Sequence, residues 1–151
     1  MSMATDTREM LIVGAGPAGA VCALALAQQG VPARVLEAQP FEARGDTRTL
    51  ALSHRARLLL ERVGVWDALG AVPPITRIHI SQRGALGVAH LDAAELAVPA
   101  LGYVLPYAEL TAALKQALAG AGVAVDCGVS VERIDNGTDV ATLHTSRGVL
   151  T

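Results

Sequence analysis

A run of small residues near the N-terminus has the composition and spacing to bind a phosphate group. It reads Gly14-Ala15-Gly16-Pro17-Ala18-Gly19. This is the pattern G-x-G-x-x-G, in which the first glycine permits a tight turn and the second lets the backbone approach a pyrophosphate. The third lets a following helix pack closely against a strand. Because the N-terminus of that helix offers free N–H groups and a partial positive charge, the run predicts a dinucleotide-binding loop.

The acidic partner of such a loop follows at Glu37, about 20 residues further along the chain. An acid at this distance hydrogen-bonds the ribose 2′-hydroxyl, which favours a dinucleotide without a 2′-phosphate. The alternative is a glycine turn between two packed elements, beside a solvated carboxylate. The pattern by itself does not separate FAD from NAD as the ligand.

Three elements must position these residues. Met10–Val13 ("MLIV") is typical of a buried parallel strand, and Ala33–Glu37 ("ARVLE") of a second one. Between them, Pro17–Gln29 predicts an apolar crossover helix that stops at Gly30. This order predicts an α/β fold with a Rossmann-like β-α-β unit at about residues 8–37, a parallel sheet and additional strands.

After Glu37 the sequence predicts a polar loop and then a helix from about Ser53 to Val63, with Ser53 as its N-cap. The apolar face of this helix is expected to consist of Leu58, Leu59, Leu60 and Val63. Trp66 is expected to pack under it. Further strands are predicted at residues 75–81, 88–91, 123–127 and 129–134, and a further helix at 109–119.

The apolar stretch from residue 10 to residue 30 also has nearly the length of a membrane-spanning helix. Its glycines and proline would interrupt such a helix early. The mixed-sign charges of Asp6, Arg8 and Glu9 do not form the basic n-region of a secretion signal. The sequence therefore disfavours both a membrane anchor and a signal peptide.

The composition of this 151-residue chain suits one domain with a substantial core, since 52% of the residues are hydrophobic. The net charge is −2 and no basic stripe is present, so nucleic-acid binding is not expected. Cys22 and Cys127 are interpreted as reduced thiols. No metal site is expected, because no ligand spacing occurs among His54, His79, His90 and His144.

Two longer blocks resemble a known family. They are "GDTRTLALSHRARLLLERVGVWDAL" and "RIHISQRGALGVAHLDAAELAVPALGYVLPYAEL". Together with "GAGPAG" and Glu37, they resemble the FAD-dependent aromatic-ring hydroxylases, and within these the hydroxylases of ubiquinone biosynthesis. The resemblance lies between about Leu11 and Leu118 and implies FAD as the cofactor.

The resemblance also implies roles for single residues. The expected cofactor-binding residues are Gly14, Gly16, Pro17, Ala18, Gly19, Glu37 and Arg48. Arg48 matches an arginine that lies along the flavin cofactor, although a solvated loop arginine is an alternative. Asp46 is a candidate to hold Arg48 or the loop, and an exposed acid in a turn is the alternative. Many relatives carry Arg, Asn or Gln near the start of the helix predicted at 109–119, where this chain reads Pro106-Tyr107-Ala108, so no side-chain contact to FAD is assigned there. No catalytic residue is assigned.

The activity implied is that of an FAD-dependent monooxygenase, which hydroxylates an aromatic ring with NAD(P)H and O₂. The implied substrate is a polyprenylated phenol, reached by a cytoplasmic protein in peripheral contact with the inner membrane. A homo-oligomer or a biosynthetic complex is a further implication. The alternative is a non-catalytic module that binds FAD or NAD. An NAD-dependent dehydrogenase is disfavoured, because such an enzyme would need a nicotinamide-contacting region and a catalytic His or Lys, and the sequence shows neither.

The resemblance also sets an expectation for domain organisation. Residues 1–151 are expected to be the N-terminal part of an FAD-binding domain, with helices and strands of the same or an inserted region after the β-α-β unit. The Asp-Gly and Gly-Asp motifs and the substrate region of the family are absent from the sequence. The chain is therefore expected to be truncated.

Overall fold

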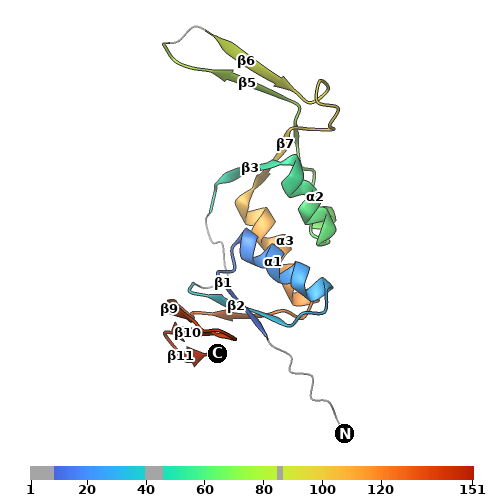
Figure 1. Cartoon of the computed structure of the whole chain (residues 1–151). Helices are drawn as coiled ribbons and strands as arrows, with labels where there is room; N and C mark the ends of the chain where they lie inside the picture. The colour runs from blue at the N-terminus through green and yellow to red at the C-terminus, as the bar shows by residue number, and fades with distance from the viewer. Residues whose placement is uncertain (1–8, 40–45, 85–86) are drawn as a thin grey trace. The chain divides into compact units, whose positions relative to one another are not determined.

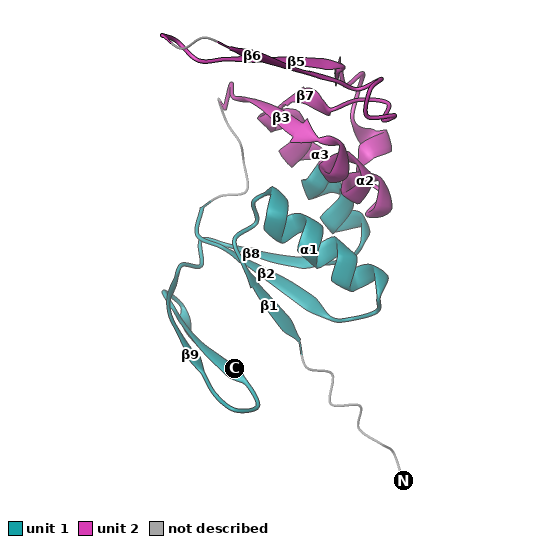
Figure 2. Ribbon diagram, turned by 45° about the horizontal axis from the view of Figure 1, so that its top comes forward, with its two compact units in different colours: residues 1–43, 114–151 teal, residues 44–113 magenta. Residues whose placement is uncertain are grey.

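The computed structural model describes residues 9–39, 46–84 and 87–151, and the chain divides into two compact units (Figures 1 and 2). Unit 1 comprises residues 1–43 and 114–151, and unit 2 comprises residues 44–113. The chain leaves unit 1 once and returns to it within one helix, α3 (Tyr107–Gly120). Unit 2 is therefore an insertion in the sequence of unit 1.

Unit 1 contains the predicted β-α-β unit. Its elements are β1 (Met10–Val13), α1 (Pro17–Gln28) and β2 (Ala33–Glu37). The sheet has the order β1-β2-β8, and both pairings are parallel. Its third strand is β8 (Ala124–Cys127). The predicted α/β fold with a parallel sheet and additional strands is confirmed, and Gly30 follows the helix with φ +70°, as a C-terminal stop requires.

Both faces of the parallel sheet are covered. Neighbouring residues of a strand point to opposite faces, and the adjacent Val35 and Leu36 of β2 are 0% and 1% exposed. On one face Leu36 packs with Val129 and Leu143. On the other face lies α1 (Figure 2). Leu143 belongs to an antiparallel sheet of β9 (Val131–Asn136), β10 (Ala141–Thr145) and β11 (Gly148–Leu150).

Unit 2 is built on an antiparallel sheet and a helix. The sheet has the order β3-β7-β4. Its strands are β3 (Thr49–Ser53), β7 (Gly102–Pro106) and β4 (Pro74–Ile75). Helix α2 (His54–Arg62) follows β3, and a single 3₁₀ turn, η1 (Trp66–Ala68), follows α2. The Ser53 hydroxyl accepts the Ala56 N–H at 3.2 Å, which confirms the predicted N-cap.

Two expectations for this region are wrong in part. The segment before α2 is not all loop, because its last five residues form β3 and pair with β7 in continuous antiparallel register. Only half of the expected apolar face of α2 is buried. Leu60 and Val63 are 4% and 6% exposed, whereas Leu58 and Leu59 are 48% and 46% exposed. A helix turns 100° per residue, so three consecutive leucines cannot all face one side.

A two-stranded ribbon extends beyond the main sheet of unit 2 (Figure 1). Its strands are β5 (Arg77–Ser81) and β6 (Val88–Asp92), which pair in antiparallel register. The strand predicted at residues 75–81 is therefore two strands, because the chain changes partner at Thr76 from β7 to β6. Nearly all ribbon residues are exposed. Among the described residues, no helix has the length and hydropathy to cross a membrane.

Candidate functional site

The glycine run forms a tight connection between β1 and α1. Gly14 follows the strand directly and adopts φ +95°, a conformation that a side chain would disfavour. Its N–H donates to the Leu36 carbonyl at 2.8 Å, which ties the turn to the end of β2. A Cβ on Gly19 would lie 2.0 Å from the Gly14 oxygen, so the first turn of α1 contacts the loop backbone directly. Two of the three pattern glycines are thus required by the fold itself.

Gly16 differs, because the fold does not require it. It is the N-cap of α1 with ordinary extended dihedrals, and a Cβ there would meet no atom within 4 Å. No side chain caps the helix, and no acidic residue stands in its first turn. Pro17, at the first helical position, has no N–H to offer. The N–H groups of Ala18 and Gly19 stand at an open helix N-terminus, where an anion is favoured.

Glu37 lies at the end of β2, beside this loop. Its Oε2 accepts the Ala15 N–H at 2.7 Å, and its Oε1 accepts the Gln39 N–H at 2.9 Å. Two backbone donors therefore fix the carboxylate in one orientation. An ionised carboxylate offers about four acceptor positions, so each oxygen keeps a lone pair for a further donor such as a ribose hydroxyl. The side chain is half-buried, which leaves it accessible to a ligand.

Arg48 lies in unit 2, on the segment that leads into β3. Its Nε donates to Asp46 Oδ1 at 2.9 Å, and its guanidinium lies 4.6 Å from the ring centre of Tyr107. The hydrogen bonds from Arg48 hold the pKa of the Asp46 carboxyl below its ordinary value. Asp46 thus does hold Arg48. The side chain of Arg48 is 69% exposed, so the pair and the stacking orient a cation that remains accessible.

The structure gathers six of the seven expected cofactor-binding residues at one place in unit 1, the loop, the start of α1 and the end of β2. The seventh, Arg48, has its own setting in unit 2. Sequence reasoning missed two partners of the Glu37 carboxylate, the backbone N–H groups of Ala15 and Gln39. It also missed the stacking of Arg48 on Tyr107. The sequence offered one hint of this stacking, because an aromatic residue at position 107 departs from the family pattern.

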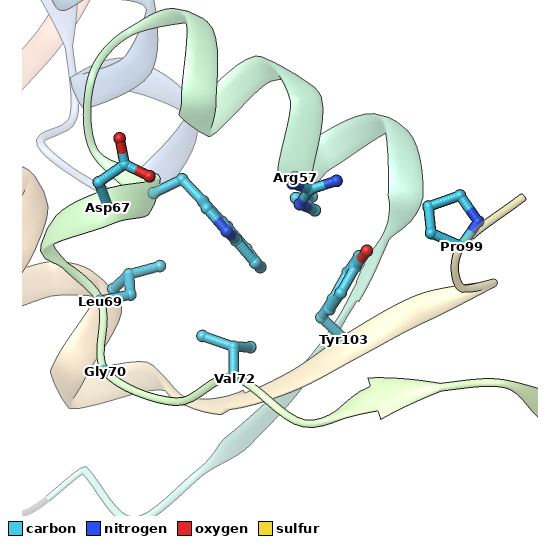
Figure 3. Close-up of a pocket in the computed structure, with 8 residues that line it drawn as sticks. Arg57, Asp67, Leu69, Gly70, Val72, Pro99 and Tyr103 are labelled. Carbon is cyan, nitrogen blue, oxygen red and sulfur yellow. The ribbon is translucent and has the colours of Figure 1, made fainter.

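A separate pocket of about 500 Å³ lies within unit 2 (Figure 3). Trp66 and Tyr103 line it and contact each other edge to face, with ring centres 5.0 Å apart. The Arg57 guanidinium lies over both rings and is paired with Glu61. Trp66 therefore contacts α2, as expected. Because these groups bind one another, the arrangement favours packing of α2 on β7 over recognition of a ligand.

The comparisons with known proteins agree on one family. The chain matches a family described as an FAD binding domain over residues 7–148. The 3-demethoxyubiquinol 3-hydroxylase of Escherichia coli (strain K12) is 38% identical over 123 residues, which cover 77% of this chain and 31% of that protein. The ubiquinone hydroxylase UbiL of Rhodospirillum rubrum is 34% identical over 107 residues, which cover 68% of this chain and 25% of that protein.

A solved structure extends the match over nearly the whole fold. CabE, an aromatic hydroxylase from angucycline biosynthesis, aligns with 97% of this chain and 29% of its own chain. The TM-score is 0.74 and the sequence identity is 26%. The chain thus spans between a quarter and a third of the length of these three proteins.

Proposed function

This chain belongs to the family of FAD binding domains, and from that premise we propose that it supplies the dinucleotide-binding part of a flavin monooxygenase that hydroxylates an aromatic ring. One observation supports the proposal. The loop of Gly14 and Gly16 leads into a helix N-terminus that no side chain caps, and the backbone of this loop is hydrogen-bonded to Glu37. These residues lie within the segment matched to the family. FAD is accordingly the cofactor, in place of the NAD that the glycine pattern alone also allows.

The residues at this place would each do one task. The N–H groups of Ala18 and Gly19 would donate to the FAD pyrophosphate, and Gly16 would leave room for it. Glu37 would accept hydrogen bonds from the ribose hydroxyls. Arg48 would bring a positive charge and paired N–H donors to the cofactor, with Asp46 and Tyr107 fixing its direction. Bound FAD supplies the redox and oxygen chemistry, while the protein binds and orients it.

The names of the relatives support a finer proposal about the substrate. Two are hydroxylases of ubiquinol or ubiquinone compounds, so we propose a polyprenylated phenol as the substrate, NAD(P)H as the reductant and O₂ as the oxidant. Such a substrate partitions into lipid, and this favours a cytoplasmic protein in peripheral contact with the inner membrane. A second candidate is an FAD-binding module without an activity of its own.

A titration of the chain with FAD tests the binding proposal. Purified chain is expected to take up about one FAD, seen as the two visible absorption bands of a bound flavin after gel filtration. Glu37→Gln is expected to weaken binding on the order of tenfold, because each hydrogen bond to a charged group contributes about 1.5–3 kcal/mol. Glu132→Gln, on the exposed strand β9, is the matched control and should leave binding unchanged. Uptake of NAD in preference to FAD would contradict the proposal.

The stacking of Arg48 on Tyr107 gives a second test. Tyr107→Leu is expected to weaken FAD binding about threefold, because an exposed cation–π contact contributes about 0.5–1 kcal/mol. Tyr107→Phe keeps the ring and should keep the affinity. Quenching of flavin fluorescence on binding gives both dissociation constants. Equal losses in the two variants would show that the hydroxyl matters and the stacking does not.

A further inference from the structure

Two histidines face each other across the exposed ribbon of unit 2. His79 of β5 and His90 of β6 are directly opposed in the antiparallel register. The His79 Nδ1 and the His90 Nε2 lie 3.0 Å apart, and the ring centres are separated by 4.8 Å. Both side chains are exposed, and neither takes part in the proposed binding of FAD.

The distance between these two nitrogens is that of two ligands on one metal ion. Imidazole nitrogens bind Zn²⁺ at 2.0–2.1 Å, so two of them on one ion stand about 2.9 Å apart at a right angle and about 3.4 Å at a tetrahedral angle. The observed 3.0 Å lies between these values. In the metal-free pair the same separation suits a hydrogen bond from one neutral ring to the other. When a metal ion binds, the donor ring changes tautomer, and its proton moves to the other ring nitrogen, so both facing nitrogens offer a lone pair to the metal.

The charges next to the pair permit a cation. Arg77 and Asp92 form the next pair on the same face of the ribbon, two residues from the histidines along each strand. Arg77 Nη2 binds Asp92 Oδ2 at 2.8 Å. That ion pair is neutral overall, so it adds no net repulsion toward a metal ion. On the other side of the histidines, on the same face, stand the uncharged Ser81 and Val88. Water can fill the remaining coordination positions because the ribbon is exposed.

We propose that His79 and His90 form a two-histidine site for a divalent transition-metal ion. Imidazole favours Zn²⁺, Cu²⁺ and Ni²⁺ over Mg²⁺ and Ca²⁺. With two protein ligands in place of the four of a structural zinc site, the ion exchanges with solvent. Its effect is to cross-link β5 to β6, because each strand supplies one ligand. An isolated pair of strands is only marginally stable, so the ribbon gains order when the ion binds.

Calorimetric titration with NiCl₂ at about pH 7.5, where free imidazoles are mostly neutral, tests the site. The full chain is used without a histidine tag, and Cys22, an exposed thiol, is replaced by serine in every sample. One Ni²⁺ per chain is expected. His79→Gln and His90→Gln are each expected to weaken binding about a hundredfold, because the second ligand binds from a high effective concentration. His144→Gln is the control, since His144 contacts Asp135 and Arg133 on another sheet.

A second measurement does not depend on substitutions. Paramagnetic Ni²⁺ should broaden the backbone amide NMR signals around His79 and His90 at the lowest Ni²⁺ concentrations. The proposal is overturned if the chain that retains both histidines binds no Ni²⁺. It is also overturned if the double variant His79→Gln/His90→Gln keeps the affinity, or if the His144→Gln control loses as much. These outcomes are independent of FAD binding.

Discussion

Replacing Gly19 with alanine is expected to lower the melting temperature of the chain by about 6 °C. The added Cβ would lie 2.0 Å from the Gly14 carbonyl oxygen and 3.3 Å from Ile12 Cγ2. The nearest atom belongs to the backbone, so the start of α1 or the glycine turn must move. Overpacking of this kind costs about 3 kcal/mol, which outweighs the gain of about 1 kcal/mol that alanine brings to a helix. The net loss of about 2 kcal/mol corresponds to this shift, because a chain of about 150 residues loses about 2–4 °C per kcal/mol.

The control for this substitution is Gly120→Ala. Gly120 also lies in a helix, at the end of α3, but a Cβ there would meet nothing within 4 Å. Its variant is expected to melt at the wild-type temperature or slightly above it. Thermal unfolding followed by circular dichroism compares the two. If Gly19→Ala melts like Gly120→Ala, the close approach of α1 to the loop is wrong.

Gly16→Val is expected to weaken FAD binding about a hundredfold or more while leaving the chain folded. The extended backbone of Gly16 accepts any residue, and the space at its Cβ is open. Loss of the preferred N-cap costs only about 1 kcal/mol. The isopropyl group would occupy the room that the pyrophosphate needs. Two charge-assisted hydrogen bonds of about 1.5–3 kcal/mol each would be lost, which weakens binding on the order of a hundredfold or more.

Gel filtration with FAD, followed by the visible spectrum, measures this effect, and circular dichroism checks the fold. Gly120→Ala, far along the chain from the loop, should retain flavin as the wild type does. A folded Gly16→Val chain that binds FAD within threefold of the wild-type affinity would show that the pyrophosphate does not approach this glycine. The two variants therefore have different expected effects. Gly16→Val lowers the affinity for FAD, whereas Gly19→Ala lowers the stability of the fold.

The sequence predicted best those elements whose signals are local. Both strands and the helix of the β-α-β unit lie within one residue of their predicted bounds, because apolar runs and glycine stops mark them. Strand β3 was missed because its partner, β7, lies some fifty residues further along the chain. Helix α3 begins two residues before its predicted start, where the Tyr107 N–H donates to the Arg48 carbonyl. Such distant partners leave no periodic pattern.

The same division holds for the candidate site. The spacing of the glycines and Glu37 placed six residues together, and the structure brings them to one loop. The donors that orient the Glu37 carboxylate are backbone groups, which every sequence carries and no pattern can mark. The opposed histidines 79 and 90 are eleven positions apart, a separation with no meaning until the register of the ribbon is known. FAD binding by the individual residues stays a prediction.

The insertion of unit 2 between β2 and β8 has a consequence for the order in which contacts form. Strands β1 and β2 belong to one contiguous segment of the chain. The other partner of β2, strand β8, follows in the sequence only after the whole of unit 2. Arg34 and Asp126, whose side chains meet at 3.3 Å across that pairing, are 92 positions apart. Loop closure over a fourfold longer chain costs about 1 kcal/mol more in entropy. We therefore expect the β-α-β unit, whose contacts are local, to form before the third strand of its sheet pairs with it.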